Sequence, residues 1–255
     1  MSLERKRFDF TKDLQKNERF SFKKDGDEGY NKIQVDLSWD LKNIKKHGLR
    51  GLDLDACAFL VGEDGVITDD SFFVYYKSNC RWLPLDPRWK DSKQRENVDV
   101  TEGELEPFDK KKYKTARNWR LETLPISKDT SVIGSWDDLG EDDEGDGESG
   151  ETMHVVLERV GDDITEIIFC VSIYPNESYG PIELQTFDKV DDAKIEITDC
   201  ETGNILCSYK LNEKYAGKTA VEVGKLTLND NGEWEFAALS DGHEGGMQTL
   251  VDIYA

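Results

Sequence analysis

Two carboxylates open a segment that otherwise has the composition of a buried β-strand. In "GLDLDACAFL", Gly51 to Leu60, Asp53 and Asp55 precede a run of apolar residues. Side chains two positions apart on a strand point to the same face, roughly 7 Å from each other. The two aspartates should therefore face the same way as Phe59. Like charges at the edge of a low-dielectric core are unfavourable unless a cation offsets them.

Two kinds of cation would offset this pair, a basic side chain or a metal ion. Arg50 is a basic residue close to the pair in the sequence. A third carboxylate, Asp40, ends the strand-like segment "VDLSWD" and is a candidate for the same site. Each acid also has a purely structural interpretation, with Asp40 as a turn residue, Asp53 at an exposed strand end and Asp55 paired with an arginine.

One further segment, "DDLGEDDEGDGESGE" (137–151), is extreme in composition. Nine of its fifteen residues are acidic, four are glycine and none is basic. Carboxylates on a glycine-rich backbone suit Ca²⁺, which takes about six to eight oxygen ligands in flexible geometry. The alternative is an acidic loop that only solubilises the chain. An EF-hand is excluded, because Met153 stands where the last ligand, a glutamate, is required.

The elements that would position these acids are strands. Short apolar segments rich in Val, Ile, Phe and Tyr predict strands at 32–39, 54–62, 71–77, 153–160, 166–174, 193–200, 205–211, 220–228 and 234–239. Turn signals at 62–65, 201–204 and 229–232 predict hairpins, residues 8–22 should include an edge strand, and residues 242–255 a short helix. This pattern predicts an all-β fold, a sandwich of two packed, mainly antiparallel sheets with few short helices.

Residues 81–120 interrupt the strand pattern. They contain 11 basic and 8 acidic residues together with Trp82, Trp89 and Trp119. Aromatic residues interleaved with Lys and Arg occur on surfaces that stack nucleic-acid bases. The near balance of acids and bases favours instead an irregular insertion whose tryptophans pack back onto the sandwich. We therefore expect one domain, residues 1–255, with an insertion at 81–120.

Charge is strongly segregated along the chain. The net charge is -21, but residues 1–120 carry +2 (25 basic and 23 acidic) and residues 121–255 carry -23 (8 basic and 31 acidic). Such an acidic half repels phosphate backbones, so we expect no nucleic-acid partner, and it attracts cations and basic proteins. With no apolar run of about 20 residues and no apolar segment at the N-terminus, we expect a cytoplasmic protein.

Residue types that carry catalysis are sparse and scattered. The five cysteines are odd in number and form no CxxC motif, which predicts reduced, buried thiols. The three histidines stand singly, which argues against a zinc site. Motifs of serine hydrolases, nucleotide-binding loops and zinc proteases are absent. We therefore expect no enzymatic activity and identify no small-molecule substrate.

Several segments together resemble the TerD family, the bacterial tellurium-resistance and stress-response proteins. The similarity rests on "VDLSWD", "LDLDACAFL", "GEDGVITDDSFFVYY", "EGDGESGE", "TEIIFCVSIY", "TGNILCSYKL", "TAVEVGKL", "NGEWEFAAL" and "GHEGGM", in this order along the chain. It covers roughly residues 10–79 and 121–255. Cys57 stands where the family has serine, and the acidic loop matches only with a shift and an insertion.

The resemblance implies a β-sandwich that binds one or two Ca²⁺ ions and acts in resistance to tellurite and other chemical stresses, without an established catalytic activity. Carried over position by position, the metal-ligand candidates are Asp40, Asp53, Asp55, Glu144, Asp146, Glu148 and Glu151, together with Asp137 or Asp138.

Three functional hypotheses follow. The first is a calcium-ordered interaction module that works with other proteins of a stress-response system. The second is a C2-like adaptor, in which bridging Ca²⁺ and the basic insertion hold the protein at an anionic membrane or on another protein. The third is an enzyme that acts on an oxyanion through Cys57, Cys80 or Cys200, which the acidic surface and the apolar surroundings of Cys57 disfavour.

Overall fold

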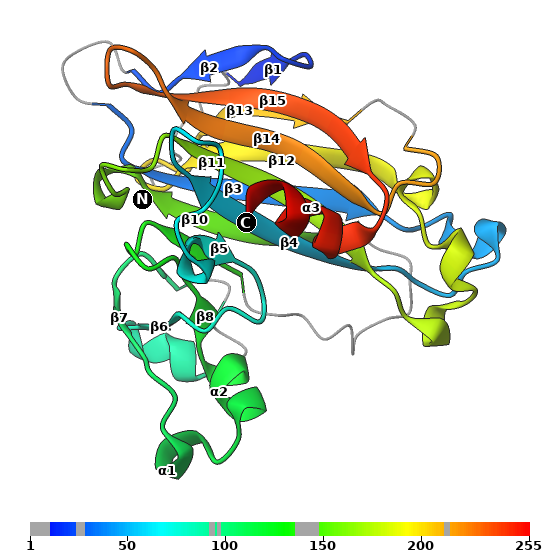
Figure 1. Cartoon of the computed structure of the whole chain (residues 1–255), viewed down its shortest axis with the longest axis horizontal. Coiled ribbons are helices and arrows are strands. Elements are labelled where there is room, and N and C mark those ends of the chain that lie inside the picture. Colours follow the sequence, from blue (N-terminus) through cyan, green and yellow to red (C-terminus); the bar gives the residue numbers. More distant parts are fainter. Residues whose placement is uncertain (1–10, 24–28, 92–94, 96–97, 136–147, 212–214) are drawn as a thin grey trace, which may run out of the picture.

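The protein is a sandwich of two six-stranded sheets, from which a smaller lobe projects (Figure 1). The computed structural model describes residues 11–23, 29–91, 95, 98–135, 148–211 and 215–255, with only the backbone of residues 148 and 149. The predicted all-β sandwich is therefore confirmed.

The first sheet has the order β1-β13-β12-β3-β10-β9. All of its neighbouring strands are antiparallel except β1 and β13, which pair in parallel. Its strands are β1 (Lys12–Leu14), β3 (Lys32–Asp40), β9 (Val132–Gly134), β10 (Glu148–Val156), β12 (Asp191–Asp199) and β13 (Ile205–Lys210).

The second sheet has the order β2-β15-β14-β11-β4-β5 and is antiparallel throughout. Its strands are β2 (Arg19–Ser21), β4 (Asp53–Val61), β5 (Phe73–Val74), β11 (Glu166–Tyr174), β14 (Ala220–Leu228) and β15 (Trp234–His243). Short 3-10 turns lie between strands of the sandwich at η1 (Ile44–His47), η2 (Asp70–Phe72), η5 (Leu157–Arg159), η6 (Glu177–Tyr179), η7 (Ile182–Leu184) and η8 (Phe187–Lys189).

The core between the sheets follows from strand alternation. On β3 every second residue, from Ile33 through Leu37 to Trp39, is buried, whereas the residues between them are partly exposed. On β4 all residues after Asp53 are buried, because this strand is covered on both faces. A strand buried on both faces needs a continuous apolar run, and "LDACAFLV" supplies it except at Asp55.

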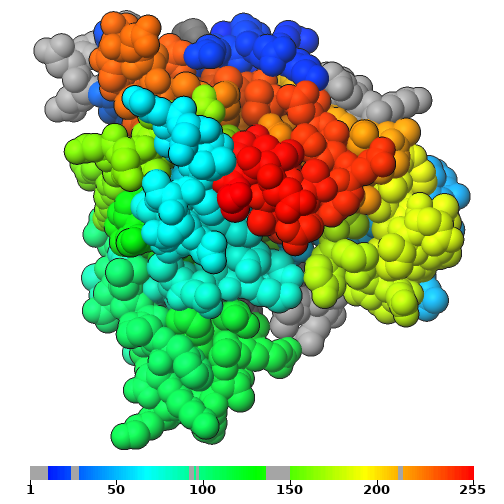
Figure 2. All heavy atoms as spheres, viewed as in Figure 1, coloured from blue at the N-terminus to red at the C-terminus, as the bar shows by residue number. Residues whose placement is uncertain are grey.

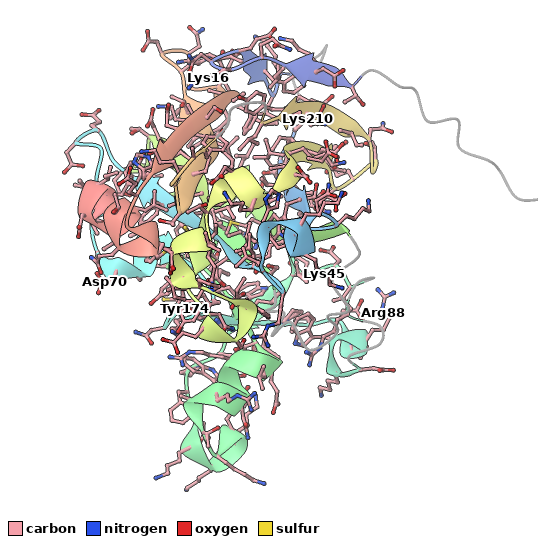
Figure 3. All side chains as sticks on the ribbon, turned by 90° about the vertical axis from the view of Figure 1, so that its right-hand side faces the viewer. Lys16, Lys45, Asp70, Arg88, Tyr174 and Lys210 are labelled. Carbon is pink, nitrogen blue, oxygen red and sulfur yellow. The ribbon has the colours of Figure 1, made fainter. Side chains whose placement is uncertain are left out.

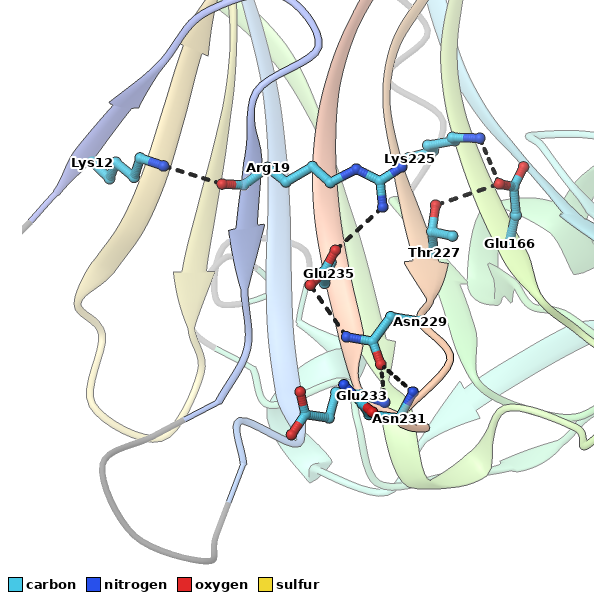
Figure 4. A network of polar contacts seen from close by, with 9 residues as sticks. All are labelled: Lys12, Arg19, Glu166, Lys225, Thr227, Asn229, Asn231, Glu233 and Glu235. Carbon is cyan, nitrogen blue, oxygen red and sulfur yellow. Dashed lines mark hydrogen bonds and ion pairs between the residues drawn. The ribbon is translucent and has the colours of Figure 1, made fainter.

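The outer face of the second sheet is divided between a helix and a polar network. The C-terminal helix α3 (Gly246–Tyr254) lies on it, and the ring of Tyr254 is 5.1 Å from that of Phe59. Away from the helix, this face carries cross-strand polar pairs, among them Arg19 with Glu235 and Lys225 with Glu166 (Figure 4). The short helix expected at the C-terminus is thus confirmed.

The insertion is more ordered than its sequence suggests. It contains β6 (Arg81–Pro84), β7 (Gly103–Leu105) and β8 (Leu124–Pro125), which form a three-stranded sheet, together with η3 (Pro87–Lys90), α1 (Lys110–Tyr113) and α2 (Ala116–Glu122). Trp82 and Trp89 are buried as predicted, but in a separate cluster with Val98, Val100, Leu124, Ile126 and Ile133. This cluster is separate from the core between the sheets, but its member Ile133 belongs to β9, the edge strand of the first sheet. Trp82 and Trp89 thus pack against the edge of the sandwich and not into its core.

The tryptophans do not form a stacking surface for bases. All three indole rings in the insertion are at most 5% exposed. Each indole N–H donates to a backbone carbonyl oxygen at 2.9 Å, from Trp82 to Val100, from Trp89 to Glu122 and from Trp119 to Glu106.

Most predicted strands and hairpins are confirmed, including those around the turns at 201–204 and 229–232. The strand predicted at 71–77 was wrong except for the two residues of β5. Asp69 accepts a hydrogen bond from the backbone N–H of Ser71, which begins the turn η2, and Tyr75 and the residues after it leave the sheet. The strand predicted at 153–160 begins earlier, at Glu148, and ends before η5.

Candidate functional site

The strand ends that carry the predicted acids meet at one end of the sandwich. β3 ends at Asp40, opposite the first residue of β10, Glu148. β4 begins at Asp53, opposite the last residue of β11, Tyr174. Because β10 is the strand that follows the acidic segment, the end of that segment lies at the same end of the molecule as these aspartates.

Glu151 connects the two sheets at this end. Its carboxylate oxygen Oε2 accepts a hydrogen bond of 2.7 Å from the backbone N–H of Ala56, the residue next to Asp55. The preceding residue has to be glycine, since a Cβ at Gly150 would lie 2.5 Å from the carbonyl oxygen of Leu37. The close approach of β10 to β3 therefore positions Glu151 against the strand that carries the aspartate pair.

Asp53 and Asp55 share the outer face of β4, as predicted. Their partners across the ladder, Tyr174 and Ser172, lie on the same face. The hydroxyl of Ser172 is 3.9 Å from the sulfur of Met247, in the first turn of α3. Asp55 is only 7% exposed, so its carboxylate is placed in a largely desolvated position beside the helix.

Asp40 does not join that pair. It alternates with the inward-facing residues of β3 and therefore faces the outer side of the first sheet. Its two carboxylate oxygens accept hydrogen bonds from Lys42, at 2.8 Å from the ammonium and 2.7 Å from the backbone N–H. These bonds hold the pKa of Asp40 below its usual value. The structure thus favours the interpretation of Asp40 as a turn residue paired with a lysine.

Five other predicted ligands have no described side chain. Asp137, Asp138, Glu144 and Asp146 lie outside the described residues, and of Glu148 only the backbone position is described. Within the described ranges, no three or more His, Cys, Asp or Glu side chains are grouped so as to hold a metal ion.

Four of the five thiols have a raised pKa, which makes them weak nucleophiles. Burial raises the pKa of the Cys170 thiol, and its neighbour Cys57 on the adjacent strand adds to the effect. Burial also raises the pKa of Cys80, and it raises that of Cys200 and Cys207 to about 12. A thiol with a raised pKa stays protonated at neutral pH and attacks electrophiles poorly.

A cleft beside Asp55 was not anticipated from the sequence. It has a volume of about 660 Å³, and its walls include Tyr76, Lys77, Tyr174 and Met247 besides Asp55. These residues come from four separate segments, so no local pattern indicates the cleft. The only signal is the pair of tyrosines followed by a lysine, "YYK", at the end of a predicted strand.

Comparison with known protein families gives a match over most of the chain. The TerD domain matches residues 10–81 and 125–254 of the chain. The chain belongs to the TerD family. The two matched ranges stop at Arg81 and resume at Pro125, so the TerD domain does not include the intervening lobe.

Curated TerD relatives cover nearly the whole chain. General stress protein 16U of Bacillus subtilis (strain 168) is 26% identical over 226 residues, which are 89% of this chain and 88% of that protein. Tellurium resistance protein TerD of Serratia marcescens is 25% identical over 222 residues, 87% of this chain and 86% of that protein.

A solved structure shows the same fold. It is a homologue of the telluride resistance protein TerD from Streptomyces coelicolor A3(2), with a TM-score of 0.50 and 18% identity. The match covers 87% of this chain and 95% of that one. None of the described helices of the present TerD protein is long and apolar enough to cross a membrane.

Proposed function

We propose that this TerD protein is a calcium-binding module of a bacterial stress response, which binds Ca²⁺ where Asp53, Asp55 and Glu151 meet the acidic segment. The ion orders this end of the sandwich as a surface for a partner protein. The names of the curated relatives support the assignment to tellurium resistance and general stress.

The hydrogen bond from Ala56 to Glu151 is the observation that carries the proposal. It brings the last carboxylate of the acidic segment to the residue that follows Asp55. Acids from two distant parts of the chain thereby converge at one end of the molecule, although like charges repel. Bound Ca²⁺ would supply the positive charge that offsets this repulsion.

The donor chemistry fits a hard cation. Asp53, Asp55 and Glu151 offer carboxylate oxygens, the ligands that Ca²⁺ takes in proteins. The described residues do not group these three carboxylates into a metal site on their own. The rest of the six to eight oxygens that Ca²⁺ requires would come from the acidic segment before Glu151. Asp40 is excluded from the proposed ligands because Lys42 occupies both of its oxygens.

Thermal unfolding tests the proposal. Ca²⁺ at about 100 times its dissociation constant should stabilise the native protein by about 2.7 kcal/mol, which raises the melting temperature by roughly 5–10 °C. Asp55→Asn should abolish this shift. The matched variant Asp40→Asn, at the same end of the sandwich, should retain it.

Two results would overturn the proposal. One is an unchanged melting curve of the wild-type protein together with no heat of Ca²⁺ binding in calorimetric titration. The other is a shift that survives in Asp55→Asn, which would place the ion elsewhere in the molecule.

A further inference from the structure

The cleft lies where three distant segments meet beside Asp55 of β4. One wall is formed by residues 73–77, the second by the end of β11 and the turn after it, and the third by the start of α3. In the space-filling view these segments adjoin one another around the C-terminal helix (Figure 2). Tyr174 lies between α3 and the helices of the lobe in the view from the side (Figure 3).

The cleft already holds an ammonium group of the protein itself. The Nζ atom of Lys77 is 4.7 Å from the centroid of the Tyr76 ring and 5.6 Å from that of Tyr174. Both separations are within the distance of about 6 Å at which a cation is attracted to an aromatic ring. A hydrogen bond to Tyr76 raises the pKa of Lys77 further, so the side chain stays charged at neutral pH.

The side chain of Lys77 is exposed to solvent, and the residue lies within the turn that follows β5, closed by the hydrogen bond from the N–H of Ser78 to the carbonyl of Tyr75. Rotation of its side chain into solvent would leave Asp55 as the only charged side chain among the residues that line the cleft. The two tyrosine rings, which now contact the Lys77 ammonium, would then be open to another positive charge.

The rim of the cleft is apolar and accessible. Tyr174 is 46% exposed and Ile182 is 40% exposed, so both side chains are open to solvent at the rim. Met247 and Val251 of α3 extend the apolar wall. An aliphatic chain that ends in a positive charge matches both parts of the cleft, because the chain contacts the apolar rim and the charge contacts the tyrosine rings.

We propose that this cleft is the receptor site for a lysine side chain of a partner protein, and that Lys77 is the internal occupant that the partner lysine displaces. The net charge of -21 attracts such basic partners from a distance. The inference goes beyond calcium binding, with which it shares only Asp55.

The probe for this site is n-butylammonium chloride, which reproduces the end of a lysine side chain. Removal of the internal competitor in Lys77→Ala should tighten its binding about tenfold relative to wild type, because the open state no longer has to be populated first. The amide signals of residues 174, 182 and 246–248 report binding by nuclear magnetic resonance. Lys45→Ala, which removes an exposed lysine from η1, should bind as the wild type does.

The tyrosine wall provides the second variant. Adding Tyr174→Ala to Lys77→Ala should weaken binding of n-butylammonium about tenfold through loss of the ring contact. The neutral isostere 1-butanol should shift the same signals much less. Equal binding of the alcohol and the ammonium, or equal affinity of Lys77→Ala and wild type, would overturn the inference.

The same variants separate this inference from calcium binding. Neither Lys77→Ala nor Tyr174→Ala removes a proposed calcium ligand, so both should retain the calcium-dependent melting shift. Absence of that shift in the wild type would contradict the proposed function alone. Absence of ammonium binding by Lys77→Ala would contradict the receptor site alone.

Discussion

Aromatic side chains are buried in both the sandwich and the inserted lobe, but what surrounds them differs. In the sandwich, Phe169 and Phe236 are fully buried among aliphatic residues of regular strands, whose backbone groups pair with neighbouring strands. In the lobe, the three buried tryptophans each donate an N–H to a backbone carbonyl. A chain with little regular structure leaves carbonyls without ladder partners, and side-chain donors then have to satisfy them.

Arg81, at the base of the lobe, is another buried side chain that donates hydrogen bonds to backbone carbonyls. Its guanidinium is 2% exposed and donates to the carbonyl oxygens of Tyr76 and Arg120 and to the hydroxyl of Thr123. These contacts join the start of β6 to α2 and to the tyrosine that lines the cleft. The sandwich thus depends mainly on apolar packing, whereas the lobe depends more on hydrogen bonds aimed at its backbone.

Phe169→Ala should have the largest effect. A buried phenylalanine truncated to alanine loses its transfer free energy and leaves a cavity, so the free energy of unfolding should fall by about 3–5 kcal/mol. Denaturant unfolding followed by circular dichroism measures this change. A loss below about 1 kcal/mol would show that the sandwich core is not packed as described.

Trp89→Phe should have a smaller and local effect. The substitution keeps an aromatic ring in the lobe cluster but removes the donor to Glu122, which should cost about 1–3 kcal/mol. Hydrogen exchange of α2 and β8 should accelerate while exchange in β11 stays unchanged. Equal acceleration in β11 would contradict the distinction between the two regions.

Asp69 lies where the two regions meet, and its ionisation should have the smallest effect. Hydrogen bonds from Ser71 and Lys128 lower its pKa to about 2. A carboxyl whose pKa is lowered on folding stabilises the protein above its ordinary pKa of about 4, and this contribution disappears as the pH falls towards 2. The melting temperatures of wild type and Asp69→Asn should therefore differ at pH 5–7 and converge near pH 2.

The titration of the Asp69 carboxyl by ¹³C nuclear magnetic resonance provides the direct check. A midpoint near pH 2 is expected, and a midpoint near 4 would show that the contacts to Ser71 and Lys128 are absent in solution.

The regular part of this fold was predictable because its signals are local. The strand at 166–174 was placed correctly at both ends, since a short apolar run bounded by polar residues marks a buried strand. The strand at 71–77 was misplaced because side chains shorten it from both ends. Asp69 caps the turn before β5, and the hydroxyl of Ser78 accepts from the N–H of Tyr75 and donates to the carbonyl of Phe73 after it. The lobe was missed as a cluster because Trp82, Val98 and Leu124 are far apart in sequence and show no shared period.

The candidate site was predictable only in part. The same-face geometry of Asp53 and Asp55 follows from strand alternation and is confirmed. The separation of Asp40 from them was not predictable, because it depends on which sheet each strand joins and on the bond to Lys42. The tyrosine cleft was not predictable either, because α3 and the segment at 174–182 come together to form it only in the folded protein.

Calcium binding at the aspartate pair can be seen in a crystal structure of the protein grown with Ca²⁺. We expect an ion beside Asp53 and Asp55, with carboxylate oxygens of β4 and of the acidic segment about 2.3–2.6 Å away and with Asp40 still bound to Lys42. An ion bound at Asp40, or none at this end of the sandwich, would show that the aspartate pair is not the calcium site.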